Sequence, residues 1–162
     1  MEFPGALYHV IVRGNERRDV FRDDADRELY LRRVHHYRER FEFRLLAYCL
    51  MSNHVHLALE SGSVPLSRVM LGLQSSYTQA FNRRYRRSGH LFQGRYKAYL
   101  VDGDRYFAAL IRYVHHNPVE ARLLGSADFQ QQLGKQLAAG VKTYFQRAGV
   151  PLNGANTSGA AQ

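Results

Sequence analysis

The chain has 162 residues, enough for one domain with its own core. It carries 23 Lys and Arg against 14 Asp and Glu, a formal net charge of +9, with 11 Tyr and 9 Phe, which favours a polyanionic partner, most simply nucleic acid. A single cysteine, Cys49, excludes a disulfide framework within the chain. Because no stretch has the length of a membrane span and no signal peptide is recognisable, we expect a cytoplasmic protein with no membrane partner. With nucleic acid as its expected partner, it would be nucleoid-associated.

Hydrophobic periodicity predicts the secondary structure. Strands are expected where apolar and polar residues alternate, and helices where apolar residues recur three and four apart. Capping residues, Gly and Pro mark the ends. In chain order we expect a strand over 6–13, a helix from Asp23 or Asp24 to about Phe41, strands over 43–50 and 54–60, a helix from about Ser67 to Arg86, a strand within 91–101 and a helix over 105–116.

This order of elements, βαββαβα, predicts an α+β fold. It is typical of one antiparallel sheet with helices packed on it, in the split-βαβ or ferredoxin-like arrangement. Residues 1–124 would form this domain and residues 125–148 a C-terminal helical extension. Residues 149–162 are rich in small and polar side chains, so a disordered tail is expected there.

Two histidines, His54 and His56, are separated by one residue at the start of the strand expected over 54–60. Residues two apart on a strand point to the same face, so the imidazoles would project side by side while Val55 and Leu57 enter the core. Two imidazoles at this spacing can bind one metal ion. The spacing alone leaves open that they are a hydrogen-bonded surface pair.

The last expected helix carries Tyr113 and Asn117, which are four residues apart and can face the same way. If this helix lies over the histidine-bearing face, an amide oxygen could complete a metal site, and a phenol could attack a phosphodiester. Tyr106 is the competing candidate, but it cannot pair with Asn117 across one turn. The alternative role for Tyr113 is half-buried packing.

Several ordered segments strengthen this interpretation. They are His9-Val10, 13–17, 47–57, 81–85, 89–98 and 112–119. Through them the chain resembles the single-tyrosine HUH transposases, relatives of the small insertion-sequence transposases, and specifically the REP-associated tyrosine transposases. The resemblance covers about residues 6–124.

The resemblance implies a site and a reaction. His54 and His56 would bind Mg²⁺ or Mn²⁺, Asn117 would complete the metal site, and Tyr113 would be the nucleophile. The implied activity is metal-dependent cleavage and rejoining of single-stranded DNA at REP-type hairpins through a 5′-phosphotyrosine intermediate. The resemblance favours a monomer, with a homodimer as the alternative.

Further polar and basic residues, most of them within these segments, are candidates for DNA contacts because their side chains can bind phosphates. They are Arg13, Asn15, Arg17, Arg18, Arg83, Arg84, Arg87, His90, Arg95 and Lys97. Two other functions stay open. A non-catalytic nucleic-acid-binding module with a basic, aromatic-rich sheet would explain the charge but not the histidine pair. A metal-dependent nuclease could also use water as its nucleophile.

Overall fold

The computed structural model describes residues 3–101. Its elements follow one another as four strands, a short 3₁₀ turn and two helices. In chain order they are β1 (Leu7–Arg13), η1 (Asn15–Arg17), α1 (Asp24–Phe41), β2 (Arg44–Met51), β3 (His54–Glu60), α2 (Leu66–Tyr85) and β4 (Lys97–Leu100).

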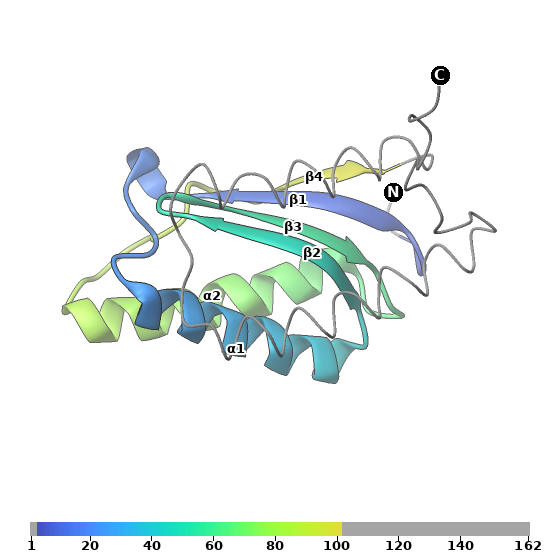
Figure 1. Cartoon of the computed structure of the whole chain (residues 1–162), viewed down its shortest axis with the longest axis horizontal. Coiled ribbons are helices and arrows are strands. Elements are labelled where there is room, and N and C mark those ends of the chain that lie inside the picture. Colours follow the sequence, from blue (N-terminus) through green and yellow to red (C-terminus); the bar gives the residue numbers. More distant parts are fainter. Residues whose placement is uncertain (1–2, 102–162) are drawn as a thin grey trace, which may run out of the picture.

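The strands form one sheet in the order β2-β3-β1-β4, and all neighbouring strands are antiparallel. Strand β3 lies between β1 and β2, and α1 connects these two, which is the split-βαβ topology. Figure 1 shows that α1 and α2 lie on the same face of the sheet. The α+β fold predicted from the sequence is therefore confirmed.

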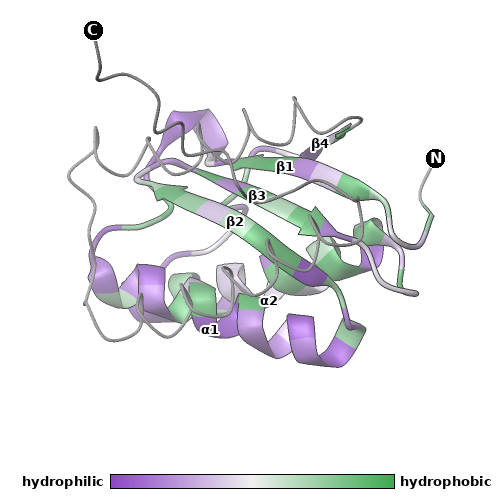
Figure 2. Cartoon of the chain, turned by 45° about the vertical axis from the view of Figure 1, so that its right-hand side comes forward, coloured by the Kyte–Doolittle hydropathy of each residue, from purple (hydrophilic) through white to green (hydrophobic). Residues whose placement is uncertain are grey.

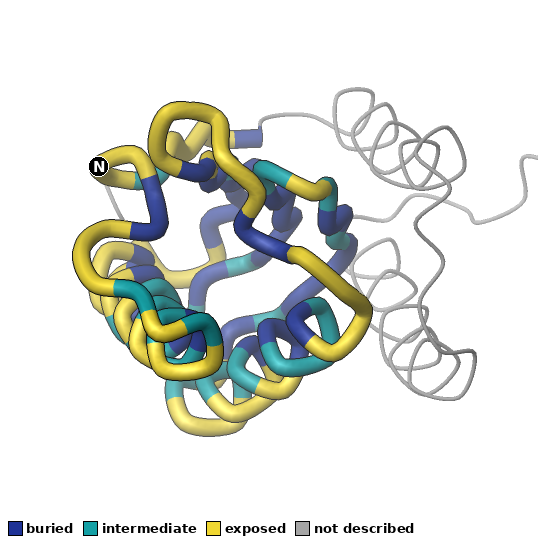
Figure 3. The backbone as a smooth tube through the Cα atoms, turned by 90° about the vertical axis from the view of Figure 1, so that its left-hand side faces the viewer, coloured by how far each residue is buried: buried dark blue, intermediate teal, exposed yellow. Residues whose placement is uncertain are grey.

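The main core lies between the sheet and the helices. Alternate residues of the central strands, among them Val10 and Leu57, are buried there against Leu73 and Tyr77 of α2. In Figure 3 the buried segments gather between the two layers, and the exposed ones follow the outer sides of the helices. The strands are mainly hydrophobic and α1 mainly hydrophilic (Figure 2), so α1 contributes only a narrow apolar stripe.

The helices begin and pack for local reasons. The Asp23 side chain caps α1 by accepting a hydrogen bond from the Asp26 backbone N–H at 2.9 Å. On α2, Gly72 lies against the Tyr37 ring of α1, and a Cβ at residue 72 would come within 2.6 Å of that ring. This glycine lets the two helices approach closely over the sheet.

Within residues 3–101, the two predicted helices and the first three predicted strands are confirmed, and their ends lie within one or two residues of those predicted. The strand predicted within 91–101 is also confirmed, as Lys97–Leu100, which pairs with β1. The preceding segment makes a single bridge, Gly14 to Phe92, and Gly94 adopts a positive φ of 62°, which interrupts the extended backbone.

The other predictions concern segments outside the described residues. These are the helix over 105–116, the extension over 125–148 and the tail over 149–162. Within residues 3–101, neither helix is long and apolar enough to cross a bilayer.

Candidate active site

The histidine pair lies on the face of the sheet opposite α1 and α2, which we call the outer face. In the antiparallel register His56 pairs with Ile11 of β1, and His54 pairs with Arg13. Val55 and Leu57, on the other face, are buried in the main core as expected. The ring centroids of His54 and His56 are 4.9 Å apart, so the two imidazoles do project side by side.

Each of these imidazoles has a polar partner at its Nδ1 atom. His54 Nδ1 lies 2.7 Å from the side-chain oxygen of Asn53. His56 Nδ1 lies 3.0 Å from Nε2 of His9, and the His9 and His56 rings are stacked with their centroids 5.2 Å apart. His9 belongs to β1 and shares the outer face with the pair. Because a neutral imidazole has one lone pair for a metal, contacts at both Nδ1 atoms favour coordination through Nε2.

The surroundings keep these imidazoles neutral. Burial lowers the pKa of His9. Burial, and secondly the Arg13 guanidinium, lower the pKa of His54. Burial, followed by the charges of His54, His9 and Arg13, lowers the pKa of His56 to about 4. Since metal ligation requires the unprotonated ring, both histidines are in the right form for a metal at neutral pH.

The chemistry of this donor set suits a divalent cation with open positions. Two neutral imidazoles provide part of a coordination shell. Between residues 3 and 101, no group of three or more His, Cys, Asp or Glu side chains is arranged to hold a metal. A complete site therefore needs further ligands, from substrate oxygens, from water or from residues beyond 101.

A basic cleft lies beside the histidine pair, between β1 and β4. Its volume is about 450 Å³, and its lining includes Arg13, Arg17, Arg95, Lys97 and Tyr99. Lys97 pairs with Ile11, and Tyr99 pairs with His9, so these side chains share the outer face with the histidines. Tyr99 is 49% exposed. Four cations around an exposed aromatic ring can hold phosphates and stack a base.

The loop that carries Arg17 and Arg18 is fixed against the hairpin of β2 and β3. The backbone N–H groups of Val20 and Phe21 both donate to the Ser52 carbonyl, at 2.8 and 3.1 Å. Gly14 is required at the start of this loop, because a Cβ there would come within 2.1 Å of the Arg18 carbonyl oxygen. The loop is thereby held next to the turn that precedes His54.

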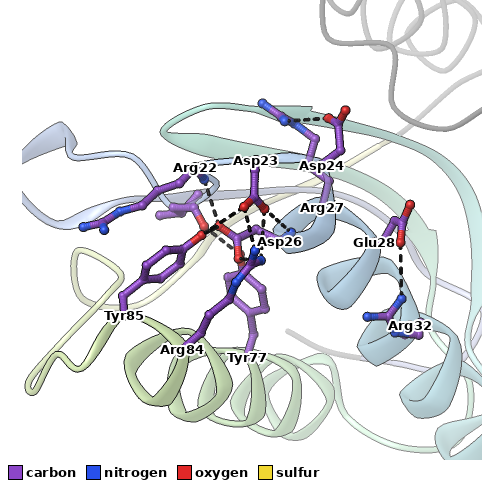
Figure 4. A network of polar contacts seen from close by, with 11 residues as sticks. Arg22, Asp23, Asp24, Asp26, Arg27, Glu28, Arg32, Tyr77, Arg84 and Tyr85 are labelled. Carbon is purple, nitrogen blue, oxygen red and sulfur yellow. Dashed lines mark hydrogen bonds and ion pairs between the residues drawn. The ribbon is translucent and has the colours of Figure 1, made fainter.

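A polar network ties the far end of this loop to both helices (Figure 4). Arg84 of α2 contacts Asp23 at 2.6 Å and Asp26 at 2.7 Å. Asp26 is fully buried and also accepts hydrogen bonds from the Tyr85 hydroxyl and the Arg22 backbone N–H. The Arg22 guanidinium lies 4.3 Å from the centre of the Tyr85 ring. The network positions the basic loop by joining the start of α1 to the end of α2.

The residues proposed from the sequence for DNA binding lie in several different places in the structure. Arg13, Arg17, Arg95 and Lys97 come together in the cleft. Asn15 lies in η1, and Arg18 pairs with Glu16. Arg83 lies in the last turn of α2 and Arg87 just beyond its end, whereas Arg84 belongs to the network. His90 lines a different, polar cleft of about 320 Å³ beside α2.

Tyr113, Asn117 and Tyr106 lie outside the described residues, so their placement relative to the histidines stays a prediction. Sequence reasoning missed the roles of His9 and Asn53 as partners of the histidine pair. Asn53 directly precedes His54, which was a usable signal. His9 is 47 residues from His56 and becomes a neighbour only through the pairing of β1 with β3.

Comparisons with known proteins agree with this architecture. Residues 3–117 match the model of the family described as IS200-like transposases. A REP-associated tyrosine transposase solved with a REP hairpin has the same fold, with a TM-score of 0.63 and 15% sequence identity over 74% of this chain and 70% of that one. A candidate transposase from Deinococcus radiodurans R1 gives a TM-score of 0.51 and 15% identity over 72% of this chain and 91% of its own. No curated protein sequence gives a significant match.

Proposed function

Because the chain belongs to the IS200-like transposase family, we propose that it is a metal-dependent endonuclease and strand transferase acting on single-stranded DNA. The observation that carries this proposal is the outer face of the sheet. There, two neutral imidazoles on β3 lie beside a cleft with four cationic side chains, and both belong to the segment that matches the family.

The metal would be held by His54 and His56, with Asn117 as the proposed third ligand. Mg²⁺ or Mn²⁺ at this position would polarise the scissile phosphodiester and offset the charge that develops on its oxygens. Arg13 would add a second positive charge beside the phosphodiester, since its guanidinium is close enough to lower the pKa of both histidines. These residues bind and orient the phosphate.

The DNA strand would follow the cleft between β1 and β4. Arg95 and Lys97 can neutralise successive phosphates, and the exposed Tyr99 ring can stack a base without selecting its identity. A single strand can bend its backbone to follow this cleft, whereas a continuous duplex holds its bases stacked inward. We therefore propose that the enzyme cuts unpaired DNA.

Tyr113 is the proposed nucleophile. Its phenol would lose a proton to solvent as the oxygen attacks the phosphorus, the bond from phosphorus to the 3′ oxygen would break, and that oxygen would take up a proton to become the 3′-OH. The DNA 5′ end would remain joined to the tyrosine. In the reverse reaction a 3′-OH displaces the tyrosine, so strands are rejoined without an external energy source.

A hairpin of the REP type is the proposed recognition element. The REP-associated relative with the same fold was solved with such a hairpin, and a hairpin presents a duplex for binding next to an unpaired segment for cleavage. The proposed working unit is a monomer, in which the tyrosine acts in the active site of its own chain. The proposed location is the cytoplasm, at the nucleoid.

The test is the formation of a covalent DNA–protein adduct. Hairpin DNA labelled at its 3′ end is incubated with the protein in Mg²⁺ or Mn²⁺ and separated on a denaturing gel. We expect an adduct with the wild type and with Tyr106→Phe, and none with Tyr113→Phe, because the latter lacks only the attacking oxygen. An adduct that persists in Tyr113→Phe and vanishes in Tyr106→Phe would move the nucleophile. DNA binding with no cleavage would instead support a non-catalytic binding module, and cleavage without an adduct a water nucleophile.

A further inference from the structure

The histidine pair has an outer layer of partners that the proposed reaction does not use. Asn53 contacts Nδ1 of His54 at 2.7 Å, and His9 contacts Nδ1 of His56 at 3.0 Å. His9 is 7% exposed and His56 is 4% exposed, so their contact is shielded from water. Buried polar groups need specific partners, so the fold decides which nitrogen of the His9 and His56 rings carries the proton.

We propose that Asn53 and His9 are positioning residues that hold His54 and His56 as Nδ1–H tautomers, so that both rings present Nε2 to the metal. This inference rests on the proposed function, because that function requires a metal ion at the histidine pair. It goes further by assigning roles to two residues outside the proposed set of metal ligands. In metal sites, such outer partners fix the ring orientation and raise the basicity of the ligand.

The tautomer of His54 follows from its contact with Asn53. An amide oxygen can only accept a hydrogen bond, so Nδ1 of His54 must carry the proton. The orientation of the Asn53 amide is itself fixed, because its Nδ2 group donates to the Arg17 carbonyl at 3.2 Å. Asn53 therefore connects a metal-binding ring to the loop whose arginine lines the DNA cleft.

The tautomer of His56 depends on His9. If His56 Nδ1–H donates to Nε2 of His9, the lone pair of His56 is on Nε2, and His9 carries its own proton on Nδ1. If His9 donated instead, the proton of His56 would move to Nε2, which could not then bind a cation. A metal bound through Nε2 of His56 therefore requires His9 to be the acceptor.

The first experiment measures Mn²⁺ affinity by calorimetry without DNA. His9→Phe keeps a ring but removes the acceptor, and we expect about 10–100-fold weaker binding. His9→Gln offers an amide oxygen near the same place, so it should restore affinity to within a few-fold. Asn53→Ala should weaken binding, and Asn53→Asp, which keeps the acceptor, should not. His35→Phe, an exposed histidine on α1, is the matched control and should bind as the wild type.

The second experiment reads the tautomers directly in the metal-free wild type, through ¹⁵N chemical shifts of the imidazoles at neutral pH. We expect protonated Nδ1 and unprotonated Nε2 in both His54 and His56. A proton on Nε2 of either ring would overturn the inference, as would equal Mn²⁺ affinities of His9→Phe and His9→Gln. Wild-type protein that binds no Mn²⁺ through His54 and His56 would contradict the proposed function itself, independently of the tautomers.

Discussion

The two faces of the sheet are built from the same strands but differ in what they carry. Leu57 and Val55 point toward α1 and α2, where they join Tyr77 and Leu73 in a continuous apolar core. Their neighbours His54 and His56 point the other way, next to a cleft lined by cations. Alternation along one strand thus places a packing residue beside each proposed ligand, so the helix-covered face stabilises the fold and fixes the positions of groups on the outer face.

Truncation on the helix-covered face should have the largest effect on stability. Leu57→Ala removes a side chain that is 1% exposed, and we expect the free energy of unfolding to fall by about 2–5 kcal/mol. Tyr99→Ala on the outer face removes a half-exposed ring, and its cost should be below about 1 kcal/mol. Urea denaturation of both variants without metal measures the difference. Equal losses would contradict the division of roles between the faces.

Acid should lower the free energy of unfolding of the metal-free protein, because His56 on the outer face resists protonation in the folded state. In the folded chain the pKa of His56 is lowered to about 4 from the ordinary 6.5, by burial and by the charges of His54, His9 and Arg13. The unfolded chain therefore binds the proton first as the pH falls below 6.5. Stability is complete above that pH and is lost toward pH 4, by about 1–3 kcal/mol.

The variant His56→Phe tests whether this pH dependence belongs to His56. Thermal unfolding between pH 7 and pH 4 should show a steeper loss for the wild type than for His56→Phe, which has no proton to bind at this position. Parallel profiles for the two proteins would show that another group is responsible.

Neutralising the cleft should have the smallest effect, and only on DNA binding. Arg95→Gln and Lys97→Gln each remove one cation proposed to bind a phosphate, so affinity for single-stranded DNA should fall by up to about tenfold. The slope of log affinity against log salt should become shallower by about 0.7 for each cation removed. Arg32→Gln on α1, an exposed residue away from the cleft, is the control. Equal effects of all three substitutions would indicate binding by net charge alone.

Local pattern was sufficient to predict most of the fold. The period of two in β3 and the Asp23 cap of α1 are properties of neighbouring residues, and both are confirmed. The pattern placed a fourth strand within 91–101 but could not show where it begins, because Leu91 and Phe92 are apolar owing to burial outside a regular strand. Periodicity cannot distinguish these cases, since tertiary packing decides between them.

The candidate site was predictable only in part, for a similar reason. The spacing of His54 and His56 placed them side by side without knowledge of the sheet. The contact of His9 with His56, and the meeting of Arg13 with Lys97 in the cleft, depend on strand register across long separations in sequence. Arg84 had the same charge as the residues of the cleft, yet the buried carboxylate of Asp26 attracts it to the helix network.

The most direct test of the account compares cleavage with binding in a variant that lacks both proposed ligands. His54→Ala/His56→Ala should bind hairpin DNA within about tenfold of the wild type, because phosphate contacts supply most of the affinity. Single-turnover cleavage in Mn²⁺ should fall below detection, while His35→Ala/His36→Ala, two exposed histidines of α1, should cleave normally. Cleavage by the His54→Ala/His56→Ala protein at the wild-type rate would contradict the assignment of the outer face as the catalytic centre.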